Sequence, residues 1–399
     1  MLLQDAQRIW DQFLAPLTTD AFLDQTLSGG FRKLDGDGSP VRTGLLGPDP
    51  YALLGGAFQL APRLTFHSAN PSGPPPTLAA VTDAAEFRRR LDEFHARNYS
   101  VRFPELRPLS PELDLLARAL EVLLHQPVSC SAFWSRGGMR APVHHDDHDL
   151  IVVQLRGRKR WFLSTRPSAL NNPWRGIPGD APELGPSATI DVVPGDLLYL
   201  PRGTLHSVDS DAESLHVAIG FTPLTAREAL AAALDHLSDL DLALRTTVGA
   251  RLAFQLQGQS FERLGAPLLD GAARLLAACR TPGFLVAAMQ RRSARAVAML
   301  SPLPVAPPAA AVGLDTLLAQ RPMAFCHLTA NAEKIDFSYP GGHIYIHLGA
   351  LEAVAFVART ARFRVRDIPG PVGDDVRLSL ATRFLEIGFL ELAPAAPDR

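Results

Sequence analysis

The spacing of apolar residues changes twice along the chain, and each change marks a different kind of structure. Over residues 1–125, apolar side chains recur roughly every third or fourth position, which predicts helices within 1–30, 82–94 and 110–124. The segment 31–80 is rich in Gly, Pro and Asp and is expected to form short strands and loops. Thr82 and Ser110 are the expected helix N-caps, the latter followed by a proline suited to the first helical turn.

Residues 127–222 have a different pattern, in which short apolar runs alternate with turn residues. The predicted strands are 130–134, 150–154, 160–163, 189–193, 196–200 and 215–221. A Pro-Gly pair at 194–195 separates two of them and predicts a tight turn. Many short strands at this spacing are typical of a β-sandwich or barrel, such as a double-sheet jelly roll (double-stranded β-helix).

The helical pattern returns at residue 225. Thr225 and Glu228 form a capping-box sequence, and an apolar stripe of leucines follows it. This segment, 225–301, is apolar enough to bury more than itself, so we expect it to form a homodimer interface; packing against the barrel is the alternative. The proline-rich run that starts at Ser301 is the best domain boundary in the chain.

The C-terminal part, 302–399, mixes helices and strands in the size and order of a winged-helix-like module. The predictions are helices near 314–319, 350–358 and 374–387, with strands near 325–329 and 344–347. A DNA-reading wing is normally basic, and this part is not, so direct nucleic-acid binding is not expected. The predicted fold is therefore α+β, with a jelly-roll domain and its N-terminal helices at 1–224, helices at 225–301 and this module at 302–399.

Composition and charge indicate which partners and which cellular compartment to expect. The formal net charge is -2, with 47% apolar and 20% charged residues, which gives no electrostatic case for nucleic acid or membrane surfaces. No apolar run is long enough for a membrane span, and the N-terminus does not resemble a secretory signal. The cysteines, three in all, are widely spaced, which favours a reducing compartment and a cytoplasmic location.

The candidate chemistry begins with a His-x-Asp pair at the mouth of an apolar strand. On extended backbone, His144 and Asp146 share a face, and His206 follows a second apolar strand. Two imidazoles and one carboxylate are the ligands of the facial triad of non-haem Fe(II) oxygenases. His145 and His148 compete for the ligand role, although His145 is expected to face away from His144.

Two more residues near the His-x-Asp pair attract attention. Asp149 is expected either to orient a ligand or to cap a turn. Lys159 stands between two arginines in a chain with only 3 Lys among its 39 basic residues. By itself it suggests a solvated basic turn; a buried carboxylate site that wants a compact charge is the alternative.

These motifs together resemble a known family. Pro-x-His-x-Asp-x-x-Asp from Pro142, Gly-x-Lys-x-Trp from Gly157 and Gly-Asp-x-Leu-Tyr-Leu-Pro-x-Gly-x-x-His from Gly195 are similar to the motifs of the JmjC-type 2-oxoglutarate oxygenases, and more narrowly to those of the ribosomal oxygenases. That subgroup has a jelly-roll domain, a helical dimerisation segment and a winged-helix-like module. The animal members have an Asn and a Tyr where this chain has Phe133-Trp134-Ser135, which leaves the substrate open.

The resemblance implies roles for individual residues. His144, Asp146 and His206 would bind Fe(II). Lys159 would pair with the far carboxylate of 2-oxoglutarate, and Ser135 and His216 would lie near this co-substrate. The implied reaction uses O2 to hydroxylate a protein or peptide side chain, such as a His or Arg of a ribosomal protein, and releases succinate and CO2.

Two other functions stay open at this point. One is a metal cupin of another class, and the other is a non-catalytic cupin-like binding protein. A metal cupin of another class has no need for Lys159. Substrate specificity is expected to lie in the loops 70–80, 135–142 and 166–187.

Overall fold

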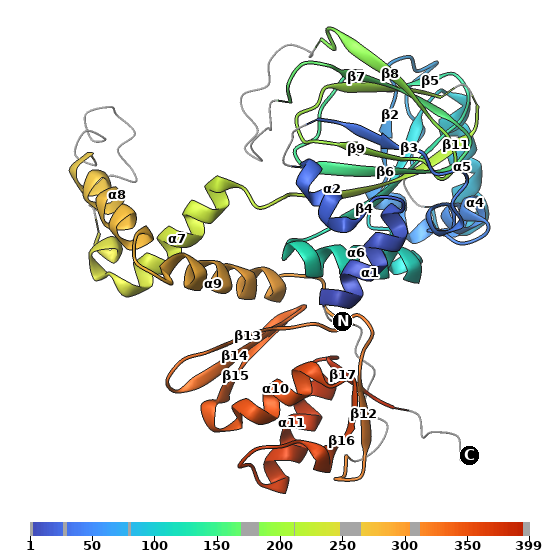
Figure 1. The fold of residues 1–399 in the computed structure, drawn as a ribbon. Coiled ribbons are helices and arrows are strands. Elements are labelled where there is room, and N and C mark those ends of the chain that lie inside the picture. The colour runs from blue at the N-terminus through green and yellow to red at the C-terminus, as the bar shows by residue number, and fades with distance from the viewer. Residues whose placement is uncertain are drawn as a thin grey trace. The chain divides into compact units, whose positions relative to one another are not determined.

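The computed structural model describes residues 3–26, 30–78, 81–168, 183–210, 212–247, 265–303 and 312–393. It divides into two compact units, one of residues Leu2–Pro223 and one that contains Leu224–Arg399 (Figure 1). The first unit holds both stretches with the candidate chemistry, so it is described first and in more detail.

Two antiparallel sheets form the centre of the first unit. Their strand orders are β1-β9-β6-β11-β4-β3-β2 and β5-β10-β7-β8. The strands are β1 Arg32–Leu34, β2 Thr65–His67, β3 Ser100–Phe103, β4 Ser129–Ser135, β5 Met139–Arg140, β6 Asp149–Arg156, β7 Lys159–Ser164, β8 Ser187–Val192, β9 Leu197–Leu200, β10 His206–Ser210 and β11 Ser214–Phe221. This double-sheet arrangement confirms the predicted jelly-roll core.

The two sheets enclose an apolar core. Leu150, Val152 and Ala218 from the larger sheet pack with Trp161 and Val208 from the smaller one. Strand β6 is buried on both faces, because Ile151 and Val153, which point the other way, are also inaccessible to solvent. Burial on both faces explains why this strand is a continuous apolar run and does not alternate with polar residues.

Helices precede and cover the sheets. They are α1 Leu3–Leu14, α2 Thr19–Thr26, α3 Pro40–Thr43, α4 Pro50–Gly56, α5 Ala84–Ala96 and α6 Pro111–Leu124, with short 3₁₀ turns at Phe58–Arg63 and Arg107–Leu109. Ser110 caps α6 as expected, since its hydroxyl accepts a hydrogen bond from the Leu113 amide at 3.1 Å. The N-cap of α5 is Asp83 and not the predicted Thr82, because the Asp83 carboxylate reaches the amides of Ala85 and Glu86.

Buried Arg42 joins three parts of the first unit. Its guanidinium donates to the carbonyls of Phe13 at 2.8 Å, Ala15 at 2.7 Å and Gly195 at 3.0 Å. The first two lie at the end of α1, and Gly195 is the turn before β9. The burial of Arg42 is therefore compensated by backbone acceptors, with a further electrostatic contribution from Asp196.

The second unit begins with the predicted helices and ends in a mixed segment. The helices are α7 Ala226–Leu240, α8 Gly265–Cys279, α9 Phe284–Ala298, α10 Leu351–Arg359 and α11 Asp374–Glu386, with 3₁₀ turns at Leu242–Arg245, Leu348–Ala350 and Val365–Asp367. The strands are β12 Leu317–Gln320, β13 His327–Ala330, β14 Lys334–Tyr339, β15 Gly342–His347, β16 Arg362–Arg364 and β17 Leu390–Leu392. They form two three-stranded sheets, β16-β12-β17 and β13-β14-β15.

One sequence prediction in this unit is wrong. The short helix expected near 314–319 is strand β12, which pairs with β16 on one side and β17 on the other. Its partners are far away in sequence, so tertiary pairing overrides the local pattern. The capping box of α7 is confirmed, because the Thr225 hydroxyl accepts from the Glu228 amide and the Glu228 carboxylate accepts from the Thr225 amide.

Among the described residues, no single helix has the length and apolar composition to cross a membrane. The helix pair α8 and α9 passes that test only when taken together, and it is bent by 102°.

Replacing Arg42 with alanine is expected to destabilise the first unit by about 3 kcal/mol, because three carbonyls lose a charged donor. Urea unfolding followed by tryptophan fluorescence measures this unit alone, since all four tryptophans precede residue 224. Arg8→Ala removes an exposed arginine paired with Asp5 and is expected to change stability by less than ~0.5 kcal/mol. Equal effects of the two substitutions would contradict the role assigned to Arg42.

Candidate functional site

The two motif stretches meet through their backbones. His144 and His206 form an isolated antiparallel β-bridge, with N–H···O distances of 3.0 Å from His144 to His206 and 2.8 Å in return. The amide of Gly203 also donates to the carbonyl of Asp146 at 2.9 Å. The His-x-Asp segment thus lies in the loop before β6 and not on a strand, but these hydrogen bonds hold it in place beside the start of β10.

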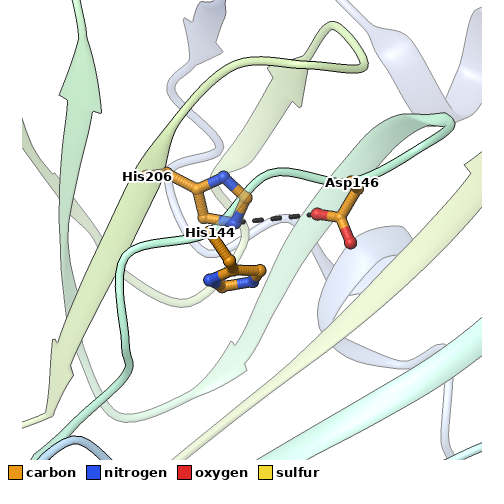
Figure 2. A group of neighbouring side chains, drawn as sticks. All are labelled: His144, Asp146 and His206. Carbon is orange, nitrogen blue, oxygen red and sulfur yellow. Dashed lines mark ion pairs between the residues drawn. The ribbon is translucent and has the colours of Figure 1, made fainter. Parts of the chain in front are cut away.

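His144, Asp146 and His206 converge on one point (Figure 2). One ligand atom from each lies within 4.8 Å of the others, and Nε2 of His206 is 3.6 Å from Oδ2 of Asp146. The Nδ1 atoms of the two histidines hydrogen-bond to backbone carbonyls, His144 to Pro142 at 2.8 Å and His206 to Thr204 at 2.9 Å. These bonds fix the tautomer and leave both Nε2 atoms available to a metal.

The environment of His206 keeps its imidazole ring neutral. Burial, and next the neighbouring His144, lower the pKa of His206 below its usual value. A neutral imidazole is the form that binds metal. The donor set of two imidazoles and one carboxylate therefore fits a ferrous ion with open positions.

The rival histidines are near the cluster but outside it. His145 and His148 also line the cavity that holds the triad. In the described part of the chain, the only group of three or more potential metal ligands is His144, Asp146 and His206.

Asp149 supports the segment that carries His206. Its buried carboxylate accepts a hydrogen bond from the Tyr199 hydroxyl at 2.7 Å, from the Arg202 amide at 3.2 Å and from the Arg202 guanidinium at 3.1 Å. Asp149 is the first residue of β6, so it fastens the turn before His206 to the strand that follows Asp146. This role of Asp149 agrees with the expected orientation of a metal ligand and differs from the alternative, the capping of a turn.

A cavity of about 550 Å³ extends from the triad between the two sheets. This size is in the usual range for small-molecule sites. Strands β2, β3 and β4 line it with hydroxyls and one arginine, and β5, β7 and β10 contribute Met139, Trp161 and Val208. Asp146 is the single carboxylate among the described lining residues.

Lys159 lies inside this cavity and not in a solvated turn. Its side chain is 1% exposed, and its ammonium group donates to the Phe133 carbonyl at 3.1 Å. No carboxylate of the described residues pairs with it, and burial alone lowers the pKa of Lys159 from 10.5 to about 7. A buried amine without a counter-ion, in a cavity with a metal-ligand cluster, is suited to receive an anionic group from outside.

Two unpaired polar atoms lie beside Lys159. Within the described structure, Nδ1 of His216 and Nε1 of Trp161 are buried and have no hydrogen-bond partner. Both side chains line the cavity. Burial first, and then Lys159, lower the pKa of His216 well below its usual value, so this ring is neutral. These atoms are available to a bound ligand with acceptor oxygens.

Ser135 is placed less directly than expected. It is buried and donates to the Ser100 hydroxyl at 2.9 Å, and Ser100, not Ser135, lines the cavity. The residues missed by sequence reasoning are Trp161, Ser131 and Arg102. Trp161 is two positions from Lys159 on a strand, which places it on the same face and was a usable signal. Arg102 gave no signal, because strand β3 was not predicted.

The part of the chain that carries this site is similar to known sequences. The family model described as a JmjC domain matches residues 109–229. The ribosomal oxygenase 2 of Rattus norvegicus is 26% identical over 220 residues, which cover 51% of this chain and 47% of that protein. A protein of Drosophila yakuba named bifunctional lysine-specific demethylase and histidyl-hydroxylase NO66 is 40% identical over 81 residues, 19% of this chain and 12% of its own length. This chain thus spans less than half the length of these relatives.

Comparison with solved structures covers more of the chain. The ribosomal oxygenase YcfD of Escherichia coli matches with a TM-score of 0.51 at 16% identity, over 94% of this chain and 98% of that one. A structure of YcfD in complex with cobalt and succinic acid matches with a TM-score of 0.50 at 15% identity, over 95% and 99%. At this identity the likeness shows the fold. Together the comparisons lead to one conclusion: residues 109–229 are similar to a JmjC domain, and the fold of the chain is similar to that of the ribosomal oxygenase YcfD.

Proposed function

We propose that this chain is an Fe(II)- and 2-oxoglutarate-dependent oxygenase that hydroxylates a protein or peptide side chain. One observation carries the proposal. The buried Lys159, which has no counter-ion among the described residues, lines the same cavity as His144, Asp146 and His206. A metal cupin of another class needs the three metal ligands but has no use for a buried cation.

Different residues would bind the metal and the co-substrate. His144, Asp146 and His206 would hold the ferrous ion, and Asp149 keeps the His206 segment in position. When bound, the iron with 2-oxoglutarate and oxygen supplies the oxidising chemistry that hydroxylates a C–H bond and yields succinate and CO2. The protein's own residues bind and orient the metal and the co-substrate, and they keep water out of the cavity.

The co-substrate would lie with its far carboxylate on Lys159. An ammonium–carboxylate pair is strong in a water-poor cavity, and it restores the charge that burial suppresses. The unpaired Nδ1 of His216 and Nε1 of Trp161 can donate to oxygens of the same molecule. Ser135 acts at most through Ser100, which it contacts. The succinate named in the YcfD complex is a dicarboxylate of the kind this arrangement fits.

The relatives suggest the substrate class. Their names describe ribosomal oxygenases and a histidyl-hydroxylase. By this resemblance, the hydroxylated residue is a His or an Arg of a ribosomal protein. The three cysteines are free in the structure, which agrees with a cytoplasmic location.

The second unit would contain the homodimer interface. We assign residues 225–301 to homodimerisation, and 302–399 to a winged-helix-like module. More than half of the exposed large apolar side chains among the described residues lie between Leu224 and Met299. Leu269 is 74% exposed and Leu276 is 55% exposed, and both lie on one face of α8. Such a concentration of apolar surface is typical of an interface.

The triad is tested by turnover of 2-oxoglutarate. Anaerobically Fe(II)-loaded protein should form succinate when oxygen is admitted, slowly if no substrate is present. His206→Ala should lower this rate by roughly a hundredfold or more, since even the loss of a side chain that hydrogen-bonds to a metal ligand costs metal sites up to that factor. Metal content after gel filtration gives a second measure and should fall in parallel.

The matched control is His343→Ala, which removes an exposed histidine on β15 in the other unit. This variant should keep both the metal and the rate. Succinate formation that survives His206→Ala at the wild-type rate would rule out the assigned ligand set.

The dimer is tested by light scattering after gel filtration. We expect a mass twice the 43.1 kDa of the chain. Leu269→Asp combined with Leu276→Asp should give the monomer mass, because charges on that face oppose burial. Leu3→Asp, which changes an exposed leucine on α1, should leave the dimer intact. A monomeric wild type would refute this assignment.

A further inference from the structure

One wall of the cavity carries a second basic side chain. Arg102 lies on β3, opposite Thr65 of β2 and Phe133 of β4 in the sheet register. Its Nη2 donates to the Ser131 hydroxyl at 3.0 Å, and its Cζ is 6.0 Å from the centre of the Phe133 ring. The guanidinium is thus held against the wall by one hydroxyl and one aromatic ring and lines the cavity.

Arg102 differs from nearby arginines in lacking an acidic partner. Arg136 pairs with Asp92 and Glu213, and Arg140 pairs with Asp209. For Arg102, no carboxylate within ion-pair distance occurs in the described structure. A guanidinium keeps its charge under all ordinary conditions, so inside a cavity it favours an anion.

The other charges of the cavity do not supply that anion. This step rests on the proposed function. A ferrous ion and a charged Lys159 are balanced by the two carboxylates of 2-oxoglutarate together with Asp146, which is the single carboxylate of the described lining. When metal and co-substrate are in place, the charge of Arg102 therefore remains uncompensated.

We propose that the substrate brings a carboxylate into the cavity and binds it on Arg102. A guanidinium has several N–H donors in one plane, so it can hold a carboxylate through two hydrogen bonds while another N–H stays on Ser131. The same charge repels a cationic side chain. The substrate thus carries a carboxylate next to the hydroxylated group, and of the two residues that the relatives suggest, this charge disfavours the arginine.

The test measures binding of three blocked amino acids to the full-length protein. The N-acetyl N-methylamides of aspartate, asparagine and arginine are titrated against Mn(II)-loaded protein saturated with 2-oxoglutarate, without oxygen, and followed by ligand-detected NMR. The aspartate probe should bind roughly tenfold tighter than the asparagine probe, a modest value for a charge-assisted hydrogen bond. Arg102→Gln should abolish this difference.

Three further variants separate charge from folding. Arg140→Gln, a matched change of an exposed arginine paired with Asp209, should keep the wild-type preference. Arg102→Lys should keep part of it because the positive charge remains. Arg102→Glu should reverse it, so that the arginine probe binds better than the aspartate probe. Equal binding of aspartate and asparagine probes to the wild type, or a preference that survives Arg102→Gln, would overturn the proposal.

The experiment also separates a failure of the carboxylate site on Arg102 from a failure of the proposed function. Binding of 2-oxoglutarate to the wild type is measured first, without a probe. If 2-oxoglutarate does not bind, the proposed function fails; if it binds and no acidic preference is found, only the inference about Arg102 fails. Acetate serves as a second probe. Tighter binding of blocked aspartate than of acetate supports a protein carboxylate, and the reverse supports a small free acid.

Discussion

The β-bridge between His144 and His206 is the contact on which the site depends. Its two backbone hydrogen bonds join the loop before β6, a strand of the larger sheet, to the start of β10 in the smaller sheet. The bridge is reinforced by Gly203, which donates to the Asp146 carbonyl, and by Asp149, which holds Arg202. The metal ligands are therefore positioned by backbone pairing, and their Nδ1 atoms are fixed by carbonyls within the same segments. A triad built in this way requires little adjustment of its side chains when metal binds.

Charge decides what the cavity accepts. Lys159 and Arg102 both lack acidic partners among the described residues, and the single lining carboxylate belongs to the triad. The two side chains differ in how they respond to the lack of an acidic partner. Burial shifts the pKa of Lys159 to about 7, so the amine can lose its proton while the site is empty. The guanidinium of Arg102 is held in place by Ser131 and Phe133. Lys159 thus gains its charge with its ligand.

The sequence predicted the parts of the structure that local patterns encode. The apolar run of β6 and the Pro-Gly turn before β9 gave the two-sheet core, and the His-x-Asp pair with His206 gave a cluster that the structure brings together. What failed depends on distant partners. Strand β12 is a strand because β16 and β17 flank it, and β3, which presents Arg102, has no strong alternation of its own. Ser135 was assigned by motif position, but the neighbouring Ser100 takes the place at the cavity wall.

The most direct test of the account is the proton uptake that accompanies 2-oxoglutarate binding. Calorimetry of metal-loaded protein without oxygen, in buffers of different ionisation enthalpy, gives the number of protons taken up. Because a carboxylate raises the pKa of Lys159 from about 7, binding at about pH 8 should take up nearly one proton, and binding at about pH 6 nearly none. Lys159→Met should bind more weakly and lose this uptake. Uptake that is equal at both pH values, or unchanged in Lys159→Met, would contradict the assignment of Lys159 to the co-substrate.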